Sequence, residues 1–233
     1  MKSTIPLTLL TLCAFTFSPV RAQDAAPEWV AIPGTSSRDG SLALAIAVKG
    51  KPLTTELIET LEPETDGLVN YIVNLDEGSI LGETQGKYWS DRASMGDYGT
   101  DVVWAEGDAL VAQTNQERFG SADSFLYSLV DGKPSTPADL LVLGTEAAMK
   151  ALAGSPQIKT HGAEAFAIRI HDVRIVTAGG QQMVQFGVGG EIPKSELEDS
   201  YFDTTVTFSI VYNENGETSG APKLEWVSTE IHE

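Results

Sequence analysis

Cysteine is almost absent from this chain. The 233 residues include one cysteine, Cys13, and it lies in an apolar N-terminal stretch. If that stretch is removed on export, the remaining chain has no disulfide, no thiolate nucleophile and no cysteine-based zinc site. A chain of this length can bury enough apolar surface to fold without such cross-links.

Positive charge is also scarce. Lysine and arginine together number 15 against 33 aspartates and glutamates, so the formal net charge is −18. Such a surface repels the phosphate groups of nucleic acids and anionic lipids. We therefore expect no nucleic-acid partner. The acidity indicates either a solvated surface or an attraction for divalent cations or a basic partner.

Long hydrophobic runs are missing except at the N-terminus. Lys2 precedes an apolar run from Ile5 to Phe17, and small residues near Ala22 are typical of a cleavage site. The run is shorter than the roughly 20 residues that span a bilayer. This pattern predicts a signal peptide, residues 1–22, cleaved after Ala22. The alternatives are an uncleaved anchor and lipidation at Cys13.

Export would place residues 23–233 in the periplasm or outside the cell. Because cleavage removes Lys2 and Arg21, 13 basic residues would face the same 33 acids, for a net charge of −20. No other run is long and apolar enough for a transmembrane helix. We expect a single β-rich globular domain over 23–233, with a soft division near 131–136 across which the core is shared.

Short apolar segments separated by turn residues predict about nine antiparallel strands in hairpins. In the segment 41–48, leucine, isoleucine and valine alternate with alanine, which predicts a central strand closely covered on its alanine face. The segment 204–212 alternates apolar and polar residues, so Thr205, Thr207 and Ser209 are expected to face water. The predicted fold class is α+β, mainly antiparallel β.

One principal helix is predicted near 137–153. Thr136 is the candidate N-cap, Pro137 is at the first helical position and Asp139 fits a capping box. Gly144 weakens the middle of this helix and could split it, and residues 154–156 (Gly-Ser-Pro) end it. A shorter helix is possible near residues 55–61.

Several turns in the first half, together with the strand segment Asn70–Leu75, share a pattern. The other elements are Ser37-Arg38-Asp39-Gly40, Trp104-Ala105-Glu106-Gly107-Asp108, Asn115 with Gly120, and Asp131-Gly132-Lys133. With them, residues 36–133 resemble exported bacterial proteins of unknown function and blades of TolB and WD40-type propellers. The resemblance implies a propeller-like meander and no catalytic residues. Since only two blade-like units are visible and a propeller needs about four or more, a full propeller is not expected.

The common catalytic motifs are missing. The chain has no Gly-x-Ser-x-Gly elbow and no Walker A loop. The segment 187–190 (Gly-Val-Gly-Gly) is predicted to be a glycine-rich turn, and it is not followed by the helix start of a dinucleotide site. His161, His171 and His232 lack zinc-ligand spacing and are interpreted as surface histidines.

Acidic residues form two clusters that could bind calcium. Asp91, Asp97 and Asp101 surround a loop with glycine and aromatic residues, and a second group contains Glu196, Glu198, Asp199 and Asp203. Calcium needs several oxygen ligands brought together by a flexible loop, and neither cluster matches an EF-hand. A solvated acidic surface is the competing interpretation, and no other cofactor is indicated.

The segment 87–92 is the best candidate recognition surface. It contains Tyr88, Trp89, Asp91 and Arg92, and aromatic residues with arginine are enriched at interface hot spots. These aromatic residues could instead anchor a loop to the core.

These observations favour a non-enzymatic binding or interaction module with a protein or envelope partner. One alternative is a secreted hydrolase that uses acidic residues without a recognisable motif, which would require two carboxyl groups facing each other across a cleft. Another is a calcium-stabilised domain. Opposed acids with shifted pKa values in a deep pocket would favour the hydrolase.

Overall fold

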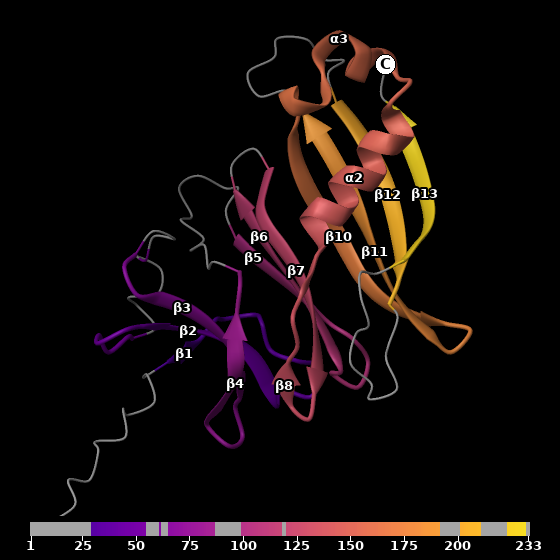
Figure 1. Ribbon diagram of the computed structural model, residues 1–233. Helices are drawn as coiled ribbons and strands as arrows, with labels where there is room; N and C mark the ends of the chain where they lie inside the picture. The colour runs from indigo at the N-terminus through magenta and orange to yellow at the C-terminus, as the bar shows by residue number, and fades with distance from the viewer. Residues whose placement is uncertain are drawn as a thin grey trace, which may run out of the picture.

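The fold is built from three antiparallel sheets and one long helix (Figure 1). The computed structural model describes residues 29–54, 61, 65–86, 99–117, 120–191, 201–210 and 223–231. The possible short helix near 55–61 therefore lies outside the described residues, except for its last position. No closed barrel or full propeller forms within the described parts of the chain, so the expected class, mainly antiparallel β with one principal helix, is confirmed.

The first sheet is a meander of four strands, drawn in indigo and purple in Figure 1. Its strands are β1 (Val30–Ala31), β2 (Leu42–Val48), β3 (Leu68–Asn74) and β4 (Ser79–Thr84). As predicted, β2 is central and both of its faces are buried. Leu44 and Ile46 pack toward the second sheet, and Ala43 and Ala45 lie in a smaller cluster that includes Trp29.

The second sheet follows the first along the chain and is built from segments between residues 99 and 139. Its strands are β5 (Gly99–Trp104), β6 (Leu110–Glu117), β7 (Gly120–Val130) and β8 (Lys133–Pro134), with β9 (Ala138–Asp139) also paired to β7. Along β6 the side chains alternate between two cores. Leu110 and Ala112 join a main core, and Val111 joins an inter-sheet core shared with the first sheet. The second sheet is therefore the middle layer of the molecule.

The principal helix, α2 (Leu140–Leu152), begins three residues later than predicted. Asp139 is the N-cap, and its side chain accepts a hydrogen bond from the Val142 N–H at 3.0 Å. Thr136 is not the cap, because Ala138 and Asp139 are extended and paired with Leu126 and Phe125 of β7. The strand pairing therefore delays the helix to the next residue that can cap it.

Gly144 does not split α2. A Cβ added there would lie 2.6 Å from a ring carbon of Phe186, so the glycine allows the helix to lie close against the third sheet. Beyond α2, Ser155 caps a second helix, α3 (Pro156–His161), with Pro156 at its first position. The Ser-Pro pair, predicted to end the first helix, therefore also begins the next one.

The third sheet carries the C-terminal half and is drawn in orange and yellow in Figure 1. Its strands are β10 (Ala167–Ala178), β11 (Gln181–Glu191), β12 (Tyr201–Ser209) and β13 (Lys223–Ile231), hydrogen-bonded in that order. The prediction of a turn at 187–190 is wrong, because these residues lie inside β11. A Cβ at Gly187 would overlap the ring of His171, and one at Gly190 would overlap Phe202, so the glycines make room for rings of neighbouring strands.

The alternation along β12 is confirmed on its apolar face. Val206, Phe208 and Ile210 are buried in the main core. On the other face Thr205 is half-buried, but Thr207 and Ser209 are buried rather than facing water. Gln185 Nε2 donates to Thr207 Oγ1 at 3.2 Å, and Ser209 Oγ donates to Glu225 Oε1 at 2.8 Å, so long side chains of the adjacent strands cover these positions.

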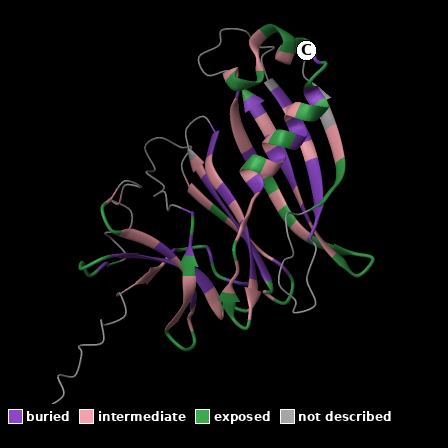
Figure 2. Cartoon of the chain, viewed as in Figure 1, coloured by how far each residue is buried: buried purple, intermediate pink, exposed green. Residues whose placement is uncertain are grey.

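The main core joins both sides of the segment 131–136. Leu110 and Leu126 of the second sheet pack in the same cluster as Leu140 of α2 and Phe186 and Val206 of the third sheet. Figure 2 shows buried residues along the strands of all three sheets. Residues from both sides of 131–136 therefore pack in one hydrophobic cluster.

Candidate functional site

Most of the predicted site residues lie outside the described residues. This applies to Tyr88, Trp89, Asp91 and Arg92 of the recognition surface and to Asp97 of the calcium cluster. Asp101 is described and lies exposed on β5, where Gln116 Nε2 approaches its Oδ2 at 3.4 Å. Of the second acidic group only Asp203 is described, and no set of three metal-ligating side chains occurs in the described part of the chain.

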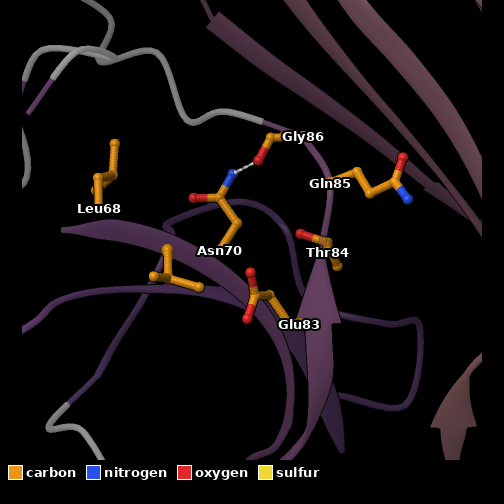
Figure 3. Close-up of a pocket in the computed structure, with 7 residues that line it drawn as sticks. Leu68, Asn70, Glu83, Thr84, Gln85 and Gly86 are labelled. Atoms are coloured by element: carbon orange, nitrogen blue, oxygen red, sulfur yellow. Dashed lines mark hydrogen bonds between the residues drawn. The ribbon is translucent and has the colours of Figure 1, made fainter. Parts of the chain in front are cut away.

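A pocket of about 440 Å³ lies where β3 begins and β4 ends (Figure 3). It is lined by Leu68, Val69, Asn70, Glu83, Thr84, Gln85 and Gly86. Asn70 and Thr84 are directly opposite each other across the β3–β4 pair, so their side chains share one face of the sheet. That face turns toward the second sheet, because Leu68 and Ile72, two residues to either side of Asn70, belong to the inter-sheet core.

Side chains from three strands hold the backbone of Gln85 and Gly86 at the edge of this pocket. Asn70 Nδ2 donates to the carbonyl of Gly86, as Figure 3 shows. The Gln85 N–H donates to the Tyr127 hydroxyl at 2.8 Å. Burial raises the pKa of Tyr127 to about 12, so its phenol is protonated at neutral pH. The amide of Gln113 lies flat against Gly86, where a Cβ would come within 2.5 Å of Nε2.

Several polar atoms at this site are buried without a hydrogen-bond partner in the described parts of the chain. They are Asn70 Oδ1, Thr84 Oγ1 and both Gln113 side-chain atoms, Nε2 and Oε1. Asn70 is 2% exposed, Thr84 5% and Gln113 0%. The Thr84 hydroxyl is close enough to Tyr127 to lower the pKa of the phenol against the effect of burial, but it makes no hydrogen bond of good geometry. Each such buried atom costs about 1–3 kcal/mol of folding free energy.

Figure 3 shows how these groups face the pocket. Asn70 Oδ1 points away from Gly86 toward Leu68, and the Thr84 hydroxyl points to the side on which Asn70 lies. The lining thus combines the apolar residues Leu68 and Val69 with the hydrogen-bonding groups of Asn70 and Thr84. Glu83, which is opposite Tyr71 and so belongs to the other face of the β3–β4 pair, adds a carboxylate to the lining. This combination is typical of a small ligand site.

A second hollow of about 210 Å³ lies on the outer face of the third sheet. Its lining includes Arg169, His171 and Asp203. His171 Nε2 lies 3.3 Å from Asp203 Oδ1, and Nδ1 lies 3.1 Å from Asp172 Oδ2. His171, interpreted from the sequence as a surface histidine, is half-buried, and its ring is held between two carboxylates above Gly187.

Two of the turns that carry the propeller resemblance lie close together. Trp104 Nε1 donates to the carbonyl of Thr35 at 2.9 Å. The Ser41 N–H and the hydroxyls of Ser37 and Ser41 lower the pKa of Asp39, whereas burial and the charge of Asp39 raise the pKa of Asp108. Neither carboxylate lines either of the two hollows described above.

Comparison of the chain with family models, curated proteins and solved structures finds no significant match. Among the described residues, no helix combines the length and the apolar character needed to cross a bilayer. The functional argument therefore rests on the site itself.

The sequence reasoning missed this pocket, although it noted Asn70 in the resemblance. Along β3, Leu68, Asn70 and Ile72 occupy one face, so the asparagine interrupts an otherwise apolar row. Gln113 interrupts the row of Val111 on β6 in the same way. A polar residue in the row of a strand that is otherwise apolar and buried is the sequence feature that would have pointed to this pocket.

Proposed function

We propose that this protein is a non-enzymatic binding module whose pocket at the ends of β3 and β4 receives an uncharged polar group of its ligand. The observation that carries the proposal is the set of buried, unpartnered polar atoms of Asn70 and Thr84 beside that pocket. Folding alone does not favour them, because an unpartnered buried polar atom lowers stability. Binding sites commonly retain such groups at a cost in stability.

The chemistry of the lining indicates the kind of group that fits. Asn70 Oδ1 accepts hydrogen bonds, Thr84 Oγ1 both accepts and donates, and Glu83 supplies a carboxylate without any cation among the lining residues. An anion would be repelled by Glu83 and by the acidic chain. A hydroxyl or amide group of a glycan or peptide supplies the donors that these atoms need, and Leu68 and Val69 accommodate its apolar part.

The test compares thermal unfolding of the full chain with glucose, N-methylacetamide and acetate. A ligand at about ten times its dissociation constant stabilises the protein by about 1.4 kcal/mol, a rise of about 3–6 °C in Tm for a chain of this size. We expect such a rise with glucose or N-methylacetamide and none with acetate. Because sugars also stabilise proteins non-specifically, the readout is the difference from the Asn70→Leu variant.

Asn74→Leu is the matched control, since Asn74 lies on the same strand at the opposite end, where its Oδ1 accepts from the Glu77 N–H. This variant should keep the full ligand effect, and Asn70→Leu should lose it. Thr84→Val provides a second, nearly isosteric test if Asn70→Leu fails to fold. Equal Tm shifts in all four proteins would show that the pocket binds none of these groups.

Export is part of the proposal, with the partner in the cell envelope or outside the cell. It rests on the signal-peptide pattern of residues 1–22. The hydrolase alternative has one supporting observation, the opposite pKa shifts of Asp39 and Asp108, but these carboxylates lie in exposed turns. Calcium stabilisation stays a prediction that thermal unfolding with calcium and with EDTA would test.

A further inference from the structure

The two edges of the third sheet differ in how they are covered. At the β10 edge, the Ile170 N–H donates to Ser121 Oγ at 2.8 Å, and Gln116 Nε2 donates to the Ile170 carbonyl at 2.7 Å. Gly120 lies against the carbonyl of Ile168 so closely that a Cβ would meet it at 2.5 Å. The second sheet therefore covers the edge of β10 around Ile168 and Ile170, which blocks strand pairing at that place.

At the other edge, β13 has no strand partner on its outer side within the described parts of the chain. In Figure 1 this strand is the yellow outer strand of the third sheet. A register shift near Phe208 interrupts its pairing with β12 at one end, but from Trp226 to Ile231 the pairing is continuous. A strand edge of this length presents a row of backbone donors and acceptors to an added strand.

Two exposed apolar side chains flank this edge. Leu224 pairs with Phe208 and so lies on the inner, core-side face, where it is 40% exposed. Trp226 pairs with Thr207 on the outer face and is 51% exposed. An added strand would thus find an apolar neighbour on the inner face, beside Leu224 and Val227, and an aromatic ring on the outer face.

We propose that β13 binds an extended segment of a basic partner protein as a fifth strand of this sheet. The charge of the chain selects this occupant, because a net charge of −18 repels a second copy and attracts a basic segment. On the outer face, Trp226 offers its ring to a lysine or arginine. The neighbouring Glu225 already pairs with Lys223 Nζ at 3.1 Å, so the ring is the main contact for a cation on this strand. The segment would alternate apolar residues on the inner face with basic residues on the outer face.

The probe is a labelled peptide of about ten residues in which valine and lysine alternate. Its control has the same composition in blocks of two, so its charge is identical but its residues cannot sort onto two faces of a strand. With the full chain in about 150 mM NaCl, where surface charges are screened, we expect the alternating peptide to bind at least about fivefold more tightly. Backbone amides of residues 223–231 should become protected from hydrogen exchange.

Variants locate the binding surface. Trp226→Ala should weaken binding by about fivefold, which corresponds to about 1 kcal/mol for a cation on an aromatic ring, and Leu224→Ser should weaken it by a similar factor. Val176→Ser is the control, since Val176 is a comparably exposed residue on the opposite edge strand. It should leave the dissociation constant within twofold of the unaltered protein.

Three outcomes would overturn the proposal. Equal binding of both peptides, or binding unchanged by Trp226→Ala, would mean that only charge attracts the probe. Sedimentation of a dimer that Trp226→Ala dissociates would mean that a second copy covers the edge. Asn70→Leu should not affect peptide binding. The proposal for β13 and the proposal for the pocket can therefore fail independently of each other.

Discussion

The two glutamines of β6 show how the presence or absence of hydrogen-bond partners changes the contribution of one side chain to stability. Gln113 is fully buried and neither of its side-chain polar atoms has a partner in the described chain. Gln116, three residues later, donates to the Ile170 carbonyl at 2.7 Å and accepts from Ser121 Oγ at 2.9 Å. The same side chain therefore lowers stability at one position and raises it at the other.

Gln113→Met should stabilise the protein by about 1–3 kcal/mol, because methionine has a similar volume and needs no hydrogen bond. Gln116→Met should destabilise it by about 1–2 kcal/mol, because it leaves the Ile170 carbonyl and the Ser121 hydroxyl without these partners. Urea unfolding of the three proteins measures both effects. A loss of stability in Gln113→Met would mean that its amide has a partner, and would weaken the case for a polar binding site.

Residue-level features were predictable where they depend on neighbours in the sequence. The turn at Asp39 and Gly40 is one example, since Asp39 accepts from the Ser41 N–H two residues on and Gly40 has a positive φ of 79°. The pocket was not predictable, because Asn70 becomes a site residue only when the β3–β4 register places it opposite Thr84 and when β6 places Gln113 against Gly86.

At the scale of elements, the alternation of apolar and polar residues located the long strands well. Capping residues and helix breakers predicted the helix boundaries less well. The segments 41–48 and 204–212, predicted as strands, overlap β2 and β12. The cap of α2 was wrong because the competing signal, pairing of residues 138–139 with β7, comes from another part of the chain. The prediction of a turn at the glycines of β11 was wrong because glycine has two uses. It allows tight turns, and inside a strand it leaves room for the aromatic ring of a neighbouring strand, as it does here.

The close approach of α2 to the third sheet leads to a prediction about Gly144. Alanine is favoured over glycine in a helix by about 1 kcal/mol. Here, however, its Cβ would lie 2.6 Å from Phe186 Cε2 and 3.0 Å from Val188 Cγ2. Because overpacking costs about 1–3 kcal/mol, we expect Gly144→Ala to destabilise the protein by about 1 kcal/mol net.

Gly154→Ala is the matched control, because no atom lies within 4 Å of a Cβ at that position. Thermal unfolding should show Gly154→Ala at or above the Tm of the unaltered protein and Gly144→Ala below it. A raised Tm for Gly144→Ala would mean that α2 can move away from Phe186 without cost, contrary to the packing of the main core.

For the whole molecule, the sequence predicted the class of fold but not the arrangement of the sheets. The segment 131–136, predicted as a soft division, contains β8 and is followed by β9, so it lies within the second sheet rather than after it. The second sheet is the middle layer because one face of its strands packs in the main core and the other face packs in the inter-sheet core. Val111 and Leu110 are both apolar, and only their tertiary contacts assign them to different cores.

This layering predicts that the molecule unfolds as one unit. The second sheet contributes Leu110 to the main core and Val111 to the inter-sheet core, so neither outer sheet can lose its packing without exposing a face of the middle one. Differential scanning calorimetry should therefore give a single transition whose van't Hoff and calorimetric enthalpies agree.

Ser121→Ala tests the same point where the second and third sheets meet, since it removes the 2.8 Å hydrogen bond that the Ile170 N–H donates to Ser121 Oγ. The loss should lower the whole transition by about 1–2 kcal/mol without splitting it, because the main core still links both sheets. Two resolved transitions, in either protein, would show instead that the first sheet or the C-terminal sheet with its helix melts by itself. In that case residues 131–136 would mark a boundary between independently folding units.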